Sequence, residues 1–180
     1  SQTAEQLLAS ATRGDERALA ALFDLHRPHL ERMIRLRLHR RLQQRVDPAD
    51  VVQETYLAVR RKFAKYIADQ PFPFRIWLRL ETGQKLIDIH RLHLGVKMRA
   101  VGQEISLQRG PLPSVASNAL AAQLLGRVST ASKAAMRTEL KIKVQEALNA
   151  MDPHDREVVV LRHFEELSNS EVAMMLELSP

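Results

Sequence analysis

The stretch LSNSEVAMMLELSP, residues 167–180, decides how the end of this chain folds. Ser168 followed three residues later by Glu171 is a capping box, which starts a helix by satisfying two backbone N–H groups. Ser179 and Pro180 again have the pattern of an N-cap and a first helical residue. A helix, a turn of about four residues and a second helix are the outline of a helix-turn-helix. The apolar side of its first helix is Val172, Ala173 and Leu176.

The second helix of such a motif enters the major groove of DNA and reads bases. The sequence stops where that helix would start. We therefore expect residues 1–180 to hold the scaffold of a DNA reader without its recognition helix. The scaffold residues are Ser168, Glu171, Val172 and Leu176.

The composition suits a helical protein. Of the 180 residues, 45% are hydrophobic but only 4% are aromatic. The absence of cysteine excludes disulfides and thiolate metal sites. No apolar run approaches the ~18 residues of a membrane span, and no signal peptide is visible. We therefore expect a cytoplasmic protein with no membrane insertion.

The net charge of +6 is unevenly divided. Residues 1–100 carry 19 lysines and arginines against 11 acidic residues, whereas residues 101–180 carry 8 against 10. Six of the eight aromatic residues fall between positions 56 and 77. Cations interleaved with rings suit nucleic-acid binding, because phosphates attract cations and unpaired bases stack on rings. A small helical core also needs large side chains, so we expect most of these rings to be structural.

Apolar spacing and cap signals predict five helices in the first half, over residues 3–12, 15–26, 29–45, 48–66 and 74–93. Pro28 predicts a kink or a break. Asp47 and Pro48 form a helix start, with the carboxylate as N-cap and proline at the first position. The expected buried side of the helix that follows is Val51, Val52, Thr55, Leu57 and Val59.

Residues 95–132 hold many glycines and prolines and few large apolar residues, which predicts a flexible linker with a short helix at 118–125. An apolar stripe then predicts a helix, and Asp152-Pro153 starts another. The expected fold is all-α, with two small helical domains at 1–94 and 133–180 joined by the linker 95–132. The stripe is Met136, Leu140, Val144, Leu148 and Met151.

Three polar residues, Asp50, Gln53 and Glu54, have the spacing i, i+3, i+4, so they project from one helix face. Such a face can dock a basic partner, although Asp50 could also serve only the helix dipole. The helix that contains Trp77 also carries cations that can follow the phosphates of an opened DNA strand, and Gln84, which can hydrogen-bond base edges. The cations are Arg75, Arg79, Lys85 and Arg91. Trp77 itself is expected in the core, and Asp88 is expected to orient neighbouring arginines.

No catalytic or metal site is expected. The pairs His26/His29 and His90/His93 have helical spacing, but no carboxylate or thiolate completes a ligand set. No phosphate-binding loop or hydrolase motif is found, so we expect no cofactor and no enzyme activity. Glu165 and Glu166 are expected to be solvated.

Several blocks together resemble the extracytoplasmic-function (ECF) subfamily of the sigma-70 family of bacterial RNA polymerase sigma factors. Residues 47–57 are similar to the second segment of region 2. Residues 74–78, then 86–88 and Arg91, are similar to its third and fourth segments, and residues 147–173 to the start of region 4. The order, the spacing and the linker agree, over about residues 5–94 and 136–180.

The resemblance implies a non-catalytic subunit that directs RNA polymerase to promoters in transcription initiation. Region 2 would bind the beta-prime clamp and open the minus-ten element, with a pocket near residues 66–73 for a flipped base. Region 4 would rest on the beta flap, and an anti-sigma factor is an expected partner. The implied polymerase contacts are Asp47, Asp50, Gln53 and Glu54. The implied minus-ten contacts are Tyr66, Arg75, Arg79, Gln84, Lys85 and Arg91.

Two other interpretations stay open. A sigma-like decoy or adaptor would bind an anti-sigma factor without promoter activity. A basic RNA-binding helical protein would bind RNA and single strands without polymerase. Binding to core RNA polymerase and a specific transcription start separate the three.

Overall fold

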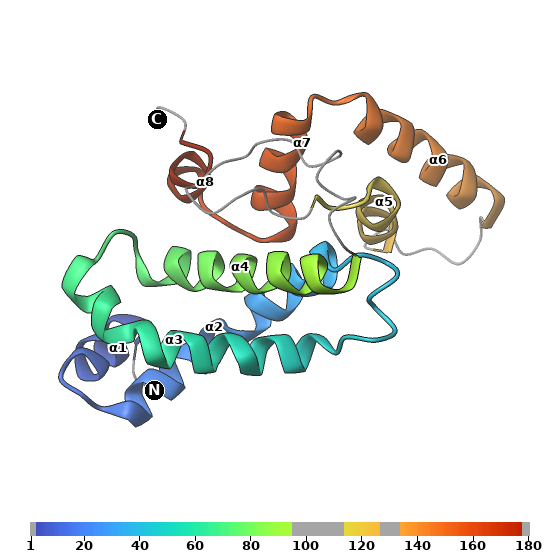
Figure 1. Cartoon of the computed structure of the whole chain (residues 1–180). Coiled ribbons are helices and arrows are strands. Elements are labelled where there is room, and N and C mark those ends of the chain that lie inside the picture. The colour runs from blue at the N-terminus through green and yellow to red at the C-terminus, as the bar shows by residue number, and fades with distance from the viewer. Residues whose placement is uncertain (1–2, 95–113, 127–133, 178–180) are drawn as a thin grey trace. The chain divides into compact units, whose positions relative to one another are not determined.

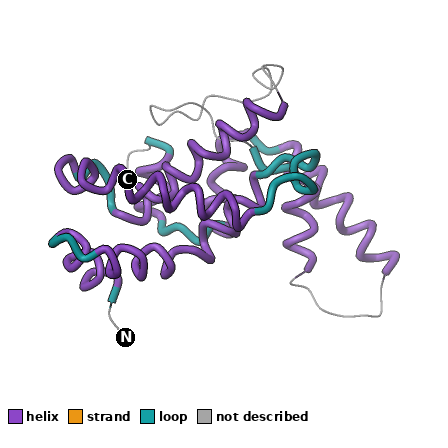
Figure 2. Tube along the Cα trace, turned by 60° about the horizontal axis from the view of Figure 1, so that its bottom comes forward, coloured by secondary structure: helices purple, strands orange, loops and turns teal. Residues whose placement is uncertain are grey.

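The computed structural model describes residues 3–94, 114–126 and 134–177, and every regular element in those ranges is a helix (Figure 1; Figure 2). The all-α prediction is therefore confirmed. The chain divides into two compact units, Ser1–Met98 and Arg99–Pro180. Most of the predicted linker, and the helix start predicted at Ser179 and Pro180, lie outside the described residues.

Within residues 3–94, the first unit contains four helices. The three long ones pack against one another, and the short α1 packs on α2. Fully buried aliphatic side chains such as Leu22, Val52 and Leu78 hold this core together, each contributing ~1.5–3 kcal/mol relative to exposure. The helices are α1 (Ala4–Thr12), α2 (Glu16–Arg37), α3 (Pro48–Asp69) and α4 (Phe74–Leu94).

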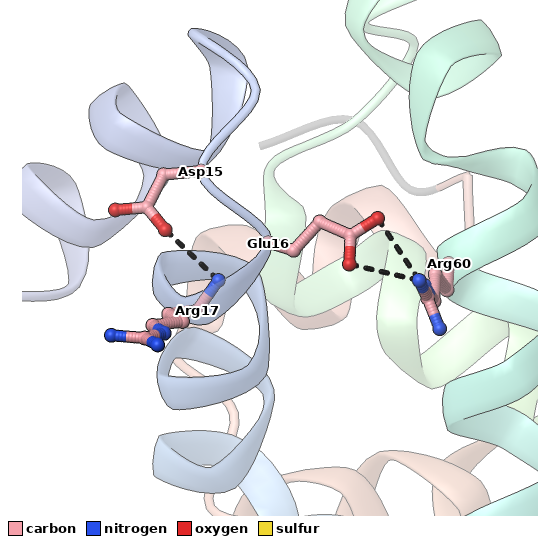
Figure 3. A network of polar contacts seen from close by, with 4 residues as sticks. All are labelled: Asp15, Glu16, Arg17 and Arg60. Carbon is pink, nitrogen blue, oxygen red and sulfur yellow. Dashed lines mark hydrogen bonds and ion pairs between the residues drawn. The ribbon is translucent and has the colours of Figure 1, made fainter.

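The start of α2 joins that helix to α3 (Figure 3). Asp15 caps α2, because its Oδ1 accepts hydrogen bonds from the N–H groups of Arg17 and Ala18 at 2.9 and 3.1 Å. The next side chain, Glu16, reaches α3, where both of its oxygens accept from Nη2 of Arg60 at 2.9 and 2.8 Å. This hydrogen bond raises the pKa of Arg60.

A kink or a break was predicted at Pro28, and the break is wrong, because α2 runs through that residue as one helix. Proline removes one backbone donor and crowds the carbonyl four residues earlier, that of Asp24. Both Pro28 and Asp24 are exposed, so water can satisfy the freed carbonyl. Buried side chains on both sides of Pro28, among them Phe23 and Leu30, keep the helix continuous by packing into one core.

The helix predicted to reach Arg45 ends instead at Arg37. Leu38 adopts an extended conformation, and a run of turns follows up to α3. These turns let Leu42 fold back into the core, where only 1% of its surface is exposed. The turn is closed by hydrogen bonds from the N–H of Leu42 to the carbonyl of His39 at 2.8 Å and from that of Val46 to Leu42 at 2.8 Å.

The second unit contains the remaining described helices, of which α5 packs on α6 and η2 contacts both α7 and α8. The Ser117 hydroxyl donates to Oδ1 of Asn149 at 2.5 Å, and the Arg156 guanidinium donates to the carbonyl of Val115. These two bonds tie the N-terminal end of α5 to later helices. The elements are α5 (Ser117–Gly126), α6 (Ala134–Ala150), α7 (Pro153–Val159), the π-helical turn η2 (Val160–Phe164) and α8 (Asn169–Met175).

Two expectations for this unit are corrected. The apolar stripe predicted along α6 is only partly buried, since Leu148 is buried but Leu140 is exposed. Glu165 is buried rather than solvated, although its neighbour Glu166 is exposed. The reason lies in the end of η2, where Glu166 takes a left-handed φ of 58° and the N–H of Leu167 donates to the carbonyl of Leu161 at 3.0 Å.

No helix within the described ranges is long and apolar enough to cross a membrane.

Candidate nucleic-acid interface

The N-terminal turns of α3 present an exposed polar face. Oδ1 of Asp47 accepts a hydrogen bond from the N–H of Ala49 at 2.8 Å, so this carboxylate is the helix cap that the sequence predicts. Asp50, Gln53 and Glu54 are all exposed on the turns that follow. Their i, i+3, i+4 spacing places them on one side of the helix. This side is open to a partner.

Leu57 belongs to the same side, which corrects its predicted burial. Its side chain is 44% exposed, whereas Val52 and Val59 of the same helix are 0% exposed. Leu57 lies three residues after Glu54, so it extends the polar face by one turn. The sequence could have shown this, because Leu57 shares its spacing with Asp50 and Glu54 rather than with the buried valines.

An ion pair joins this face to α4. Nζ of Lys85 lies 3.1 Å from Oε2 of Glu54, and both side chains are partly exposed. The structure therefore brings together one residue implied to bind polymerase and one implied to bind DNA. An exposed pair of this kind stabilises a fold by no more than ~1 kcal/mol, so neither charge is committed to the fold.

The second half of α4 carries Gln84 and Arg91, which belong to the implied minus-ten surface, and Asp88, which contacts Gln84. Nε2 of Gln84 donates to Oδ1 of Asp88 at 3.0 Å, so Asp88 orients an amide rather than the expected arginine. Arg91 is exposed near the end of the helix, and Arg75 is half-buried in its first turn. Gln84, Lys85 and Arg91 thus form the accessible part of this surface.

Two other implied minus-ten residues are not part of the surface. Arg79 is only 4% exposed, and Tyr66 is also buried. The Tyr66 ring stacks on Trp77 with ring centres 4.3 Å apart, and its hydroxyl donates to the carbonyl of Phe72 at 3.1 Å. Burial raises the pKa of Tyr66. In this conformation neither side chain can meet a DNA strand.

The aromatic cluster of α3 and α4 forms a core. Phe63, Tyr66, Phe74 and Trp77 are all buried and in mutual ring contact, with centre separations between 4.3 and 6.4 Å. The prediction that Trp77 is structural is confirmed. The rings therefore fix the angle at which α4 leaves the loop around Pro73, and they orient the polar residues further along.

Comparison with protein families decides the identity. A family model described as ECF sigma factor matches residues 1–180. The chain belongs to the ECF sigma factor family. Comparisons with curated proteins and with solved structures found no match. Sigma factors of this family are non-catalytic factors of transcription initiation, and in general they bind core RNA polymerase, promoter DNA and anti-sigma factors.

A second link between α3 and α4 of this sigma factor was missed by the sequence reasoning. Nζ of Lys62 lies 2.5 Å from Oε2 of Glu81, whose side chain is almost completely buried. A buried carboxylate needs a cationic or hydrogen-bonding partner. The spacing contained the signal, because Glu81 follows the buried Trp77 by four residues and so shares its helix face.

Two histidines of the sigma factor, His39 and His90, serve its fold. The N–H of His39 donates to Nε2 of the buried His90 at 3.1 Å, which joins the turn after α2 to the end of α4. Burial, with a smaller contribution from His39, lowers the pKa of His90 to about 4. Because Nε2 of His90 accepts the hydrogen bond from His39, its lone pair is not available to a metal ion. Within the described residues no three potential ligands gather into a metal site.

In the second unit, the helix start predicted at Ser168 is present. Oγ of Ser168 accepts from the N–H of Glu171 at 3.2 Å, and Oε2 of Glu171 accepts from the N–H of Ser168 at 2.7 Å. Val172 and Leu176 are buried, as is Met175, which the sequence reasoning did not include. The turn between η2 and α8 is held by the Arg162 guanidinium, which donates to the carbonyl of Leu167.

Proposed function

We propose that this sigma factor docks on the beta-prime clamp of core RNA polymerase with the N-terminal face of α3 and opens the minus-ten element with the exposed side of α4. Asp47, Asp50, Gln53 and Glu54 form the docking face. Lys85, Gln84 and Arg91, with Arg75 at the start of the helix, are the contacts to the opened strand. We place this role in transcription initiation in the cytoplasm, where RNA polymerase acts.

The observation that carries this proposal is the ion pair between Glu54 and Lys85. It shows that the acidic face of α3 and the cationic side of α4 are adjacent, so a partner on one is close to a partner on the other. Both side chains are partly exposed and the pair is weak, so each charge can exchange its partner at small cost. Core polymerase and promoter DNA are such a pair of partners.

The second unit supports a different contact. Its capped helix α8, together with the turn after η2, has the outline of the first half of a helix-turn-helix. We place the beta flap of polymerase and the minus-thirty-five element as the partners of this unit. An anti-sigma factor would compete for one or both units.

The experiment that tests docking is a binding titration of the full chain with core RNA polymerase. Asp50→Ala with Glu54→Ala should weaken binding by about tenfold or more, which is ~1.4 kcal/mol. Asp69→Ala is the matched control, because Asp69 is an exposed carboxylate at the other end of the same helix. Equal losses in both variants would contradict docking through this face.

Promoter opening is tested with holoenzyme and promoters that it selects from a library of genomic fragments. Lys85→Ala should reduce permanganate reactivity of the opened strand while binding to core polymerase is retained. A chain that binds an anti-sigma factor but never supports a specific start would be the decoy. A chain that binds RNA and ignores core polymerase would be the RNA-binding protein.

A further inference from the structure

The turn between α2 and α3, residues 38–45, presents three exposed arginines: Arg40, Arg41 and Arg45. None of them forms an ion pair with any residue that the structure describes. No acidic residue occurs in this turn, and the first one after it, Asp47, is occupied as the cap of α3. We call residues 38–45 the arginine turn.

Three other arginines of the same unit have carboxylate partners. Arg27 lies 2.8 Å from Asp24, Arg35 lies 3.2 Å from Glu31, and Arg60 lies 2.8 Å from Glu16. The contrast matters because an arginine beside a carboxylate has half of its fork occupied. In the arginine turn the guanidinium groups face solvent, where a planar fork can bind phosphate oxygens.

The arginine turn is held in place rather than loosely attached. Leu42 is buried beneath it, and the Gln43 side-chain amide donates to the carbonyl of Leu38 at 3.2 Å. The N–H of Arg41 donates to Nδ1 of His39 at 3.2 Å, and the N–H of His39 donates to His90. All of these bonds use backbone groups or other side chains, so the three guanidinium groups stay available to a ligand.

The bond between His39 and His90 also gives the turn its place in the unit. Arg40 follows His39 in the chain, and the exposed Arg91 follows His90. The arginine turn therefore lies beside the end of α4, next to the surface that we propose for the opened strand. The arginine turn and the end of α4 thus carry exposed cations on both sides of this hydrogen bond.

We infer that the arginine turn binds the phosphate backbone of double-stranded DNA, independently of base sequence. A single strand is the poorer fit, because single-strand binding uses exposed rings, and residues 38–45 contain no Phe, Tyr or Trp. Guanidinium groups without rings or base-reading partners position a duplex but do not specify its sequence. The contact goes beyond the proposed minus-ten function and would hold duplex flanking the opened segment.

The test measures binding of the full chain to a fluorescent 30-base-pair duplex of mixed sequence by anisotropy at several salt concentrations. Each phosphate contact contributes about 0.9 to the slope of log affinity against log salt. Arg40→Gln with Arg41→Gln should therefore lower the slope by about 1.8, and adding Arg45→Gln should lower it by about 0.9 more. The matched control is Arg13→Gln with Arg17→Gln, two exposed arginines at the junction of α1 and α2.

The expected result is a reduced slope for the turn variant and an unchanged slope for the control, with equal circular dichroism spectra. Equal reductions in both variants would overturn the inference, because net charge alone would then explain binding. The inference would also be overturned if the full chain did not bind the duplex detectably, or if the turn variant bound it with an unchanged slope. Single-stranded oligo-dT and the non-nucleic-acid polyanion polyglutamate serve as further probes. A loss of binding by the turn variant to either of these, with duplex binding unchanged, would overturn it as well. Because no polymerase is used, failure here is distinguishable from failure of the proposed function.

Discussion

The two halves of α4 use charge in opposite ways. In residues 74–82 the charged Arg79 and Glu81 are buried with Trp77 in the core, and Lys62 of α3 reaches in to pair with Glu81. In residues 84–94 the helix is amphipathic, with Leu86 buried and Lys85 and Arg91 at the surface. Arg79, the buried cation of the first half, therefore belongs to the fold, and the cations of the second half are available to a partner.

The largest effect that would test this comparison is expected at Trp77. Trp77→Ala should lower the free energy of unfolding by about 3–5 kcal/mol, because it opens a cavity between Tyr66 and the other rings. Urea unfolding followed by circular dichroism measures the change. A loss below ~1 kcal/mol would show that the rings are not the support of the first half of α4.

The next effect separates two residues that the resemblance assigns to one surface. Arg79→Ala should cost about 1–3 kcal/mol, because the packing of its buried stem and the interaction of its head group are lost. Lys85→Ala should change stability by less than ~0.5 kcal/mol. Thermal unfolding of both variants measures the difference, and Arg79→Met, which keeps the stem, is the control. Equal costs for Arg79→Ala and Lys85→Ala would remove the distinction between the halves.

The sequence predicted the helices well because caps and apolar spacing are local signals. Asp47 with Pro48, and Ser168 with Glu171, determine helix starts within a few residues of themselves. The break at Pro28 was predicted wrongly, because the effect of a proline depends on whether the freed carbonyl faces water, which is a property of the tertiary structure. The end of α2 was misplaced for a similar reason, since Leu42 has helical spacing but is buried from a turn.

The candidate site was predicted less completely than the fold. Spacing placed Asp50, Gln53 and Glu54 together on an exposed face. It could not show that Arg79 and Tyr66 are buried, because a cation or a phenol has the same one-dimensional pattern in a core and on a surface. The pairing of Glu54 with Lys85 depends on how α3 and α4 pack, and no local signal encodes it.

The inward side of the second half of α4 can be tested by pH. The pKa of His90 is about 4 in the fold against an ordinary value of 6.5, so between these values the unfolded chain binds more protons. The free energy of unfolding should be fully maintained above pH 6.5 and fall as the pH drops towards 4, with up to ~1.4 kcal/mol per pH unit from this group. Denaturant unfolding at a series of pH values measures the slope.

His90→Gln should make that slope shallower, and the exposed His93→Gln should leave it unchanged. The comparison with the unmodified chain is needed because carboxylates also titrate near pH 4. A wild-type slope in His90→Gln would mean that this histidine is not buried as a neutral acceptor for His39.

The smallest expected effect concerns the pair that joins the two proposed surfaces. A double-mutant cycle with Glu54→Ala and Lys85→Ala should give a coupling energy of ~0.2–1 kcal/mol, because both side chains are partly exposed. The coupling should shrink at 1 M salt, where the Debye length is ~3 Å. The exposed pair Asp24 and Arg27 offers a matched cycle on α2. A coupling above ~2 kcal/mol for Glu54 and Lys85 would mean that Lys85 stabilises the fold, as Arg79 does. Lys85 would then not be available to bind DNA.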